Sequence, residues 1–371
     1  MNDLPRYFDH AATSPLRERA REAMLTLGPL ANPASTHRAG QRASALLEEA
    51  RERIAACVDA HPTEVVLLSG GTEAVNLGLK GLWLSRNQGR DAVVSAAIEH
   101  AATMDSLEWL ERQGATVHTV GCSPDSVTHT DVDLGSAAMA TISWANNETG
   151  VLQPVEPWAA AADEARVPLH VDAIAALGHV PVAFRASGAT CMSIAAHKVG
   201  GPVGAGALLV SRAAKLTPLL HGGGQQRGLR SGTGDVAGAI GFAVALEDAL
   251  AELEQERLRL SAFAARIREA AKRPGVRITG ETAERLPGTV HLTVDGANAE
   301  ALTFLLDGFD IQASNGSACT AGVVQESHVV RAMGVSGAPL RLSMGWSTTE
   351  QDADALVKAL PDVIERARAS R

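Results

Sequence analysis

The sequence predicts an α/β protein built around a mostly parallel β-sheet. Segments with helical spacing of apolar residues alternate with short, strand-like segments along most of the 371 residues. Glycine occurs 35 times and punctuates this alternation. Most of the strand-like segments are apolar throughout, which is typical of parallel strands that are covered by helices on both faces.

The predicted elements begin with a helix over residues 41–59, after a loop at 32–40 that is rich in Asn, Pro, Ser and Gly. Leu46, Leu47 and Ile54 recur with helical spacing and indicate an amphipathic helix. Apolar segments then predict strands at 64–68, 91–96, 116–120, 138–143, 169–172, 190–194 and 206–210.

A charged segment at 246–268 has helical periodicity and few helix breakers, so it predicts a long connecting helix. Beyond it, helical stretches accompany two further predicted strands, at 288–294 and 340–343. This change in pattern indicates a second, smaller α+β domain. We expect a large domain over residues 14–253, and a small domain formed by residues 1–13 together with 254–371.

Composition excludes several classes of function. The net charge is −9 and no block of Lys and Arg is present, which argues against broad binding to a nucleic-acid backbone. Aromatic residues make up only 3%, too few for a platform that stacks single-stranded bases. No apolar run reaches the roughly 18 residues that a membrane span needs, and the first residues do not resemble a secretory signal. The four cysteines are far apart in sequence and predict neither disulfides nor a metal site, so we expect a cytoplasmic protein.

A glycine-rich turn follows the strand predicted at 64–68. The sequence Ser-Gly-Gly-Thr at 69–72 leads from this strand into a helical segment. Backbone N–H groups at the start of a helix, together with the helix dipole, bind anions, and the hydroxyl of Thr72 adds a donor. An ordinary capped turn accounts for the same residues, so both interpretations stay open for this turn alone.

Two charged residues lie at the ends of predicted strands. Lys198 follows His197 and precedes a loop rich in Gly and Pro. A lysine beside apolar groups loses its proton readily and forms a Schiff base with an aldehyde, although most lysines in such places are merely solvated. Asp172 ends the strand at 169–172, where its carboxylate either pairs with a ring nitrogen or caps a helix.

Together, these three features match what pyridoxal phosphate requires of a protein. The anion site anchors the phosphate group, and the carboxylate of Asp172 keeps the pyridine nitrogen protonated. Lys198 binds the aldehyde. The combination therefore predicts an enzyme that uses pyridoxal 5'-phosphate.

Eight motifs occur in order along the chain: YFDHAAT, NPASTHRAG, SGGTEAVNLGLKG, ANNETGVLQPV, HVDA, AAHKVGGPVGAGAL, HGGGQQRGLRSGT and SNGSACTAG. In this combination the chain resembles the cysteine desulfurases of the group-I, iron–sulfur-cluster type, in the class-V aminotransferase family. The resemblance extends over nearly the whole chain. It implies fold type I of the pyridoxal-phosphate enzymes and an obligate homodimer with the cofactor near the interface.

The resemblance also implies the cofactor contacts. Lys198 is the implied Schiff-base lysine, and Asp172 is the implied partner of the pyridine nitrogen. Asn147 in ANNETG corresponds to a hydrogen-bond donor for the phenolic oxygen of the cofactor; without the resemblance it would be a turn former. The implied phosphate contacts are Gly71, Thr72 and His197, with Thr233 reaching over from the other subunit.

Three further residues are implied to act on cofactor or substrate. His100 in AAIEHAAT corresponds to a histidine that stacks on the cofactor ring and assists proton transfer. Arg341 corresponds to a bidentate clamp for the substrate carboxylate, and Asn32 to a second substrate contact. From the residues alone, each has an ordinary alternative: a histidine at a strand end, an arginine at a strand end, and a residue that forms a turn.

Cys319 lies in a run of small, polar and glycine residues at 314–322, which neither packs a core nor forms a rigid element. A thiol in such a run is expected to be exposed, which suits a nucleophile that takes up sulfur and delivers it. The other cysteines have structural explanations: Cys57 on a helix, Cys122 at a strand end and Cys191 in a buried strand. The resemblance implies that L-cysteine yields L-alanine, and that sulfur passes through a Cys319 persulfide to an acceptor protein.

The chain departs from the family pattern at two positions. Ala175 stands where the family usually has a glutamine that binds a cofactor oxygen, and Ala195 stands where a serine usually binds the phosphate. Each lost hydrogen bond is worth about 1 kcal/mol, so we expect weaker cofactor retention or altered tuning. The sequence also ends at Arg371, before the tail with which several family members contact their scaffold, which makes delivery to such a scaffold less secure.

Several alternatives stay open from the sequence. The pathway of the sulfur acceptor is open: it is either iron–sulfur cluster assembly or the thiolation of tRNA, DNA or a metabolite. The substrate is L-cysteine, or the enzyme is a selenocysteine lyase or another C–S lyase. A catalytically idle dimeric scaffold is a third possibility, because of Ala175 and Ala195.

Overall fold

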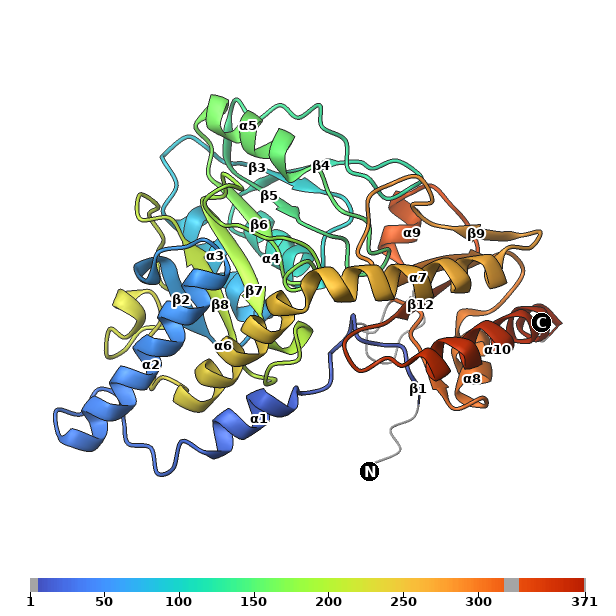
Figure 1. Cartoon of the computed structure of the whole chain (residues 1–371). Helices are drawn as coiled ribbons and strands as arrows, with labels where there is room; N and C mark the ends of the chain where they lie inside the picture. The colour runs from blue at the N-terminus through green and yellow to red at the C-terminus, as the bar shows by residue number, and fades with distance from the viewer. Residues whose placement is uncertain (1–5, 317–326, 370–371) are drawn as a thin grey trace.

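The computed structural model describes residues 6–316 and 327–369, and its central feature is a seven-stranded β-sheet (Figure 1). Its strand order is β2-β8-β7-β6-β5-β3-β4, and every neighbouring pair is parallel except the two that β8 forms with β7 and β2. The strands are β2 (Val65–Leu68), β3 (Ala92–Ala96), β4 (Thr116–Val120), β5 (Ala137–Ser143), β6 (Leu169–Asp172), β7 (Cys191–Ala195) and β8 (Gly206–Val210). The prediction of an α/β fold with a mostly parallel sheet is confirmed.

The burial of the strands explains why their sequences are apolar. Every residue of β5, β6, β7 and β8 is buried, because helices cover both faces of the sheet. Strand β4 lies at the sheet edge and carries exposed polar residues. The bounds predicted from the sequence agree with the observed ones to within one residue at each strand of this sheet.

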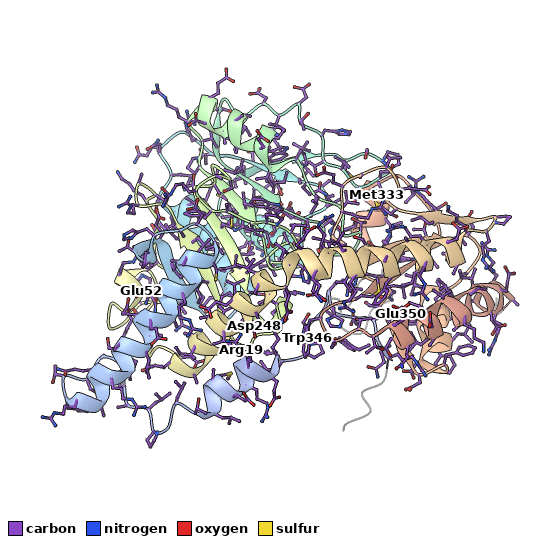
Figure 2. All side chains as sticks on the ribbon, viewed as in Figure 1. Arg19, Glu52, Asp248, Met333, Trp346 and Glu350 are labelled. Carbon is purple, nitrogen blue, oxygen red and sulfur yellow. The ribbon has the colours of Figure 1, made fainter. Side chains whose placement is uncertain are left out.

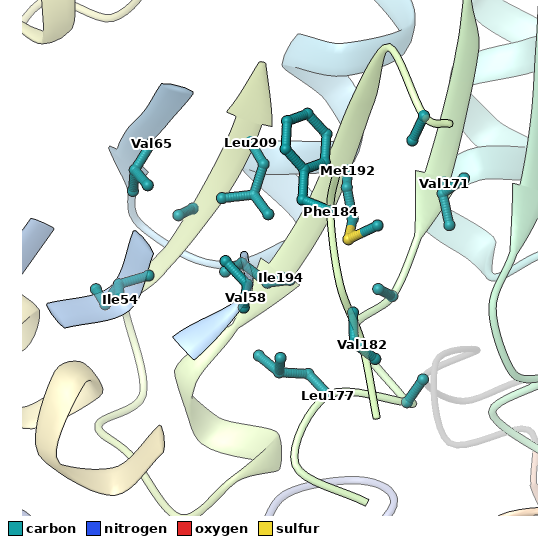
Figure 3. Packing of buried hydrophobic residues seen from close by; sticks show 14 of the residues in the cluster. Ile54, Val58, Val65, Val171, Leu177, Val182, Phe184, Met192, Ile194 and Leu209 are labelled. Atoms are coloured by element: carbon teal, nitrogen blue, oxygen red, sulfur yellow. The ribbon is translucent and has the colours of Figure 1, made fainter. Parts of the chain in front are cut away.

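Two layers of helices enclose the sheet. Helices α3 and α4 pack on one face, while α2, α5 and α6 cover the other and α1 packs on α6. Figure 3 shows Ile54 of α2 and Phe184 packed with Met192, Ile194 and Leu209 of the sheet. The helices are α1 (Glu18–Leu25), α2 (Arg38–Cys57), α3 (Gly71–Leu84), α4 (Ala101–Arg112), α5 (Val155–Ala165) and α6 (Val236–Ala251), with short 3₁₀ helices η1 (Pro62–Glu64), η2 (Ala196–Lys198) and η3 (Gln226–Gly228).

The C-terminal part of the chain forms a second hydrophobic core around a three-stranded antiparallel sheet of order β12-β10-β9. Helices α7 and α8 pack on this sheet, and α10 packs on both of these helices. The elements are α7 (Leu253–Ala271), β9 (Val276–Ile278), β10 (Thr289–Val294), α8 (Ala299–Asp307), β11 (Ile311–Gln312), α9 (His328–Ala332), β12 (Ala338–Ser343) and α10 (Glu350–Ala369). Both strands predicted in this part of the chain are present, as β10 and β12.

The N-terminal residues join this second core. Strand β1 (Arg6–Tyr7) pairs in parallel with β11, and Phe8 is fully buried among residues of the C-terminal part. The division into a large domain over 14–253, and a small one of 1–13 with 254–371, stays a prediction. The two cores are the physical basis for proposing it.

The long helix predicted at 246–268 is wrong in one respect, because α6 and α7 meet there with a break at Glu252 (Figure 1). The carboxylate of Glu252 accepts a hydrogen bond of 2.7 Å from Arg17, which lies just before α1. Nearby, Arg19 of α1 forms an ion pair with Asp248 of α6 (Figure 2). These contacts with α1 accompany the break, and a helical pattern along a single segment cannot reveal them.

Candidate active site

The first part of the site is the start of α3, directly after β2. Gly70 precedes the helix with φ of +146°, and no side chain caps the N-terminus of α3. A β-carbon on Gly71 would lie 2.4 Å from Cδ1 of Ile174, so a larger residue at this position would require the Ile174 side chain to move. The backbone N–H groups at this helix start, with the helix dipole, are suited to bind an anion, and the anion site itself stays a prediction.

The second part lies at the carboxyl ends of the central parallel strands. There a cavity of about 240 Å³ opens beside the start of α3. It brings together seven of the predicted site residues: Gly71, Thr72, His100, Asn147, Asp172, His197 and Lys198. Ala12, Ala102, Ser143, Ala145, Ile174 and Ala175 complete its lining. A crevice at this edge is where open α/β sheets bind their ligands.

Asp172 is a buried carboxylate at the end of β6. One of its oxygens accepts a hydrogen bond of 2.9 Å from the backbone N–H of Ile174. Burial raises the pKa of Asp172 to about 6, although this hydrogen bond and the charge of Lys198 act in the opposite direction. The carboxylate is therefore suited to a cationic partner inside the cavity, since such a partner would offset its desolvation.

Glu99 lies behind this site, and the sequence analysis did not single it out. Its side chain is fully buried, and one oxygen accepts a hydrogen bond of 2.8 Å from the backbone N–H of Ser143. Burial, followed by the negative charge of Asp172, raises the pKa of Glu99 to about 8. Glu99 lies in the short loop between the apolar strand β3 and helix α4, and an acidic residue at such a place is the sequence signal that could have identified it.

Lys198 is held at the cavity by the N-terminal segment. Its Nζ donates hydrogen bonds to the carbonyl oxygens of Ala11, at 2.5 Å, and Ala12, at 2.9 Å. Ala12 also lines the cavity. Residues almost two hundred positions earlier in the chain therefore set the position of the amine.

Two histidines at the cavity are neutral at neutral pH. His100 is the N-cap of α4, and its Nδ1 accepts the backbone N–H of Ala102 at 3.1 Å, which puts the ring proton on Nε2. Burial, then the charge of Lys198, lowers the pKa of His100 to about 4. The same two causes lower the pKa of His197 to about 4, and His197 Nδ1 lies 3.3 Å from the Thr13 hydroxyl.

Arg341 of β12 is connected to the site without lining the cavity. Its guanidinium donates to the carbonyl oxygen of Asn147 at 2.9 Å and to the carboxylate of Asp9 at 2.8 Å. The side chain is almost fully buried, and its Nε has no hydrogen-bond partner among the described residues. Arg341, the predicted contact for the substrate carboxylate, thus lies next to Asn147. Two of its guanidinium nitrogens already donate to groups of the protein.

Two predicted residues lie away from this cavity. Asn32 is exposed, and its side chain accepts the backbone N–H of Ala34 at 2.9 Å, as in a simple turn. Thr233 is exposed and lines a different cavity, next to Ser69 and Arg230. Cys319 lies outside the described residues.

The two departures from the family pattern differ in position. Ala175 lines the cavity, so a longer polar side chain at this position would reach into it. Ala195 is fully buried at the end of β7 and is not part of the cavity lining. The effect of both alanines on cofactor retention stays a prediction.

The remaining cysteines are weak candidates for a thiolate. Burial raises the pKa of Cys57 to about 11, and it also raises the pKa values of Cys122 and Cys191. All three are free thiols. Within residues 6–316 and 327–369, no group of three or more His, Cys, Asp or Glu side chains is placed to hold a metal ion. No helix in this same part of the chain is long and apolar enough to cross a membrane.

Comparison with known proteins agrees with this architecture. The Aminotransferase class-V family matches residues 6–356. An IscS-like cysteine desulfurase of Mycobacterium tuberculosis is 43% identical, over 98% of this chain and 97% of that protein. A cysteine desulfurase IscS of Methanosarcina thermophila is 34% identical, over 98% of this chain and 92% of that protein. The solved structure of a NifS-like protein superposes with a TM-score of 0.90 at 29% identity, covering 98% of this chain and all of that one.

Fold and cavity together define a pyridoxal-phosphate enzyme of fold type I, which confirms the predicted fold class. The chain belongs to the class-V aminotransferase family and, within it, to the cysteine desulfurases. Pyridoxal 5'-phosphate is the cofactor of this family, and the residues present fit it. The uncapped start of α3 suits its phosphate, buried Asp172 suits its protonated ring nitrogen, and Lys198 suits its aldehyde.

The raised pKa of Asp172 leads to a prediction for the cofactor-free protein. Because the pKa rises from 3.8 to about 6 on folding, the stabilisation from its proton is complete below pH 4 and is lost as the pH rises through 6. Asp172→Asn should therefore raise the free energy of unfolding at pH 8 by roughly 2–3 kcal/mol, with little change at pH 4. Urea unfolding of both proteins at the two pH values measures this difference.

The same variant should retain the cofactor less well, because a neutral amide cannot offset a protonated ring nitrogen. Cofactor content after gel filtration provides this second readout. A cofactor-free Asp172→Asn protein that is less stable than wild type at pH 8 would contradict the prediction.

Proposed function

We propose that this protein converts L-cysteine to L-alanine and takes up the sulfur as a persulfide on Cys319, for transfer to an acceptor protein. The stoichiometry balances: the substrate loses one sulfur atom and the enzyme thiol becomes a persulfide. The observation that carries the proposal is the single cavity that joins Lys198, Asp172 and His100 beside the start of α3. Family membership supplies the reaction class.

The residues of the cavity divide the work of holding the cofactor. We assign the phosphate to the start of α3 with Gly71, Thr72 and His197, and the phenolic oxygen to Asn147. Asp172 would hold the ring nitrogen in its protonated form. When bound, pyridoxal phosphate draws electrons away from the α-carbon of an amino acid.

Lys198 and His100 would carry out the proton transfers. Lys198 would take the proton from the α-carbon of L-cysteine as its general base, since it lines the same cavity as Asp172 and its amine is held there by the N-terminal segment. His100 is neutral and carries its proton on Nε2, so it can donate that proton to the carbon from which sulfur leaves. Its ring would stack on the cofactor, as the family resemblance implies.

Sulfur transfer belongs to Cys319. Its thiolate would attack the sulfur of the substrate, so that a sulfur–sulfur bond forms and the carbon–sulfur bond breaks. The electron pair of the broken bond stays on carbon, which takes up a proton and becomes the methyl group of alanine, while Lys198 would return the α-proton to the α-carbon. Raised pKa values disfavour the same role for Cys57 and Cys122.

We further propose a homodimer. Thr233 and Asn32 are exposed and lie outside the cavity of their own chain, as expected if they contribute to the site of a partner. Two apolar side chains in loops near these motifs, Val203 and Leu220, are 81% and 48% exposed, which also favours a covered surface here. In such a dimer Thr233 would contact the phosphate, and Asn32 and Arg341 would contact the substrate.

The resemblance to iron–sulfur-cluster-type desulfurases supports a scaffold protein of cluster assembly as the acceptor. We place the enzyme in the cytoplasm, because the three described cysteines are free thiols, as expected in a reducing compartment. An enzyme that serves thiolation would catalyse the same reaction and would differ only in the protein that receives the sulfur.

The decisive experiment follows the purified holoenzyme with L-cysteine, L-selenocysteine and L-alanine. L-cysteine should change the near-visible absorbance of the cofactor and yield equal amounts of alanine and bound or released sulfur. Mass spectrometry after alkylation should locate the persulfide on Cys319. A protein that processes only selenocysteine, or that stays inert with added cofactor, would contradict the proposal.

A further inference from the structure

The turn at 146–150 connects the cofactor cavity with the residues on either side of segment 317–326. Asn147 lines the cavity, while the adjacent Glu148 is hydrogen-bonded to Ser327 on one side of that segment and lies close to Gly316 on the other. The carboxylate of Glu148 accepts a hydrogen bond of 2.6 Å from the hydroxyl of Ser327. The same oxygen lies 3.0 Å from where a β-carbon on Gly316 would stand.

Each flank is suited to this contact. Ser327 is buried at the start of α9, where its hydroxyl oxygen also accepts the backbone N–H of Val330 at 3.2 Å. Gly316 has φ of +91°, and its N–H donates to the hydroxyl of Ser314 at 3.1 Å. Any larger residue at 316 would both adopt a strained backbone and crowd the carboxylate of Glu148.

Hydrogen bonds fix the backbone of the turn, so Glu148 has a defined position relative to the cavity. The side-chain oxygen of Asn146 accepts the N–H groups of Glu148, at 3.0 Å, and Thr149, at 2.8 Å. Its amide donates to the carbonyl oxygen of Ile98 at 2.8 Å. Arg341 adds a link, because it donates to the Asn147 carbonyl and pairs through its backbone with Ser314.

We propose that Glu148 is a positioning residue for sulfur transfer, which holds Ser327 through its hydrogen bond at a defined place relative to Asn147, with Gly316 close beside it. This inference rests on the proposed role of Cys319, which lies in the segment between these two residues. The Glu148 carboxylate is almost fully buried, so a lost partner is not readily replaced by water. Without the contact, the substrate would bind and exchange its α-proton as before, while the sulfur-transfer step would slow.

Three variants separate this role from a general electrostatic effect. Ser327→Ala removes the hydrogen bond to Glu148, together with the cap on the Val330 N–H, without changing any charge near Arg341. Glu148→Gln keeps an oxygen that can accept from Ser327, whereas Glu148→Ala does not. The matched control is Ser126→Ala, because the buried Ser126 hydroxyl accepts a hydrogen bond of 2.9 Å from Thr149 in the same turn but has no contact with Gly316 or Ser327.

Two readouts are taken from each holoenzyme in a single turnover with L-cysteine: the absorbance change of the cofactor and the persulfide on Cys319. Ser327→Ala and Glu148→Ala should form persulfide about tenfold more slowly, the effect of one hydrogen bond to a charged group, with the absorbance change retained. The rate of persulfide formation in Glu148→Gln should stay within about threefold of the wild-type rate, and Ser126→Ala should form persulfide at the wild-type rate.

Persulfide formation at the wild-type rate in both Ser327→Ala and Glu148→Ala would overturn the positioning role alone. So would an equal loss of both readouts, which would indicate a general structural defect. If wild-type protein forms no persulfide on Cys319, the proposed function fails, and this inference fails with it.

Discussion

Lys198→Ala is expected to lower the rate of alanine release from L-cysteine by about 10³-fold or more, because it removes the group proposed to move the α-proton. Its amine is the one basic group that the cavity places beside Asp172 among the described residues, since His100 and His197 have pKa values near 4. Alanine release per enzyme, followed by amino-acid analysis, measures the effect.

The matched control for this prediction is Lys215→Ala, which removes an exposed lysine from a loop outside the cavity and should leave the rate unchanged. Lys198→Ala also loses the hydrogen bonds to Ala11 and Ala12, so thermal unfolding should be recorded for both variants. A folded Lys198→Ala protein that keeps more than about a tenth of the activity would show that another group moves the proton.

Cys319→Ala is expected to lower sulfur transfer by about 10³-fold or more, because it removes the nucleophile itself. Binding of L-cysteine and the absorbance change of the cofactor should persist, since Lys198, Asp172 and the start of α3 are unchanged. Single-turnover measurement of persulfide and alanine, beside the absorbance change, separates these steps.

Cys57→Ala and Cys122→Ala serve as controls for Cys319→Ala. Both thiols have raised pKa values, so their removal should not change the rate of persulfide formation. Persulfide or sulfide formation in Cys319→Ala at the wild-type rate would assign the sulfur to another acceptor.

The grouping of seven predicted residues around one cavity was predictable because most of them lie at the ends of strands or the starts of helices. Gly71 and Thr72 start the helix after β2, and Asp172 ends a parallel strand. The carboxyl ends of parallel strands meet at one edge of a sheet, so residues at these ends come together whatever the details of packing. The motif order along the chain then indicated the chemistry.

Contacts between distant segments were not predictable. Lys198 is held by carbonyl oxygens of Ala11 and Ala12, and Glu148 by the hydroxyl of Ser327. Asn32 and Thr233 lie outside the cavity, although their motifs belong to the same set of eight as those of the cavity residues. Periodicity and turn chemistry carry no signal for such pairs, because they depend on how complete elements pack.

The sequence by itself therefore determined the alternation of strands and helices, the glycine-rich turn before α3 and the identity of the chemical groups. These depend on propensity and on neighbours a few residues away. Only the tertiary structure decided the break at Glu252, the burial that raises the pKa values of Asp172 and Glu99, and the hydrogen bond of Glu148 to Ser327. These depend on desolvation and on contacts between segments far apart in the chain, which exist only when the chain is folded.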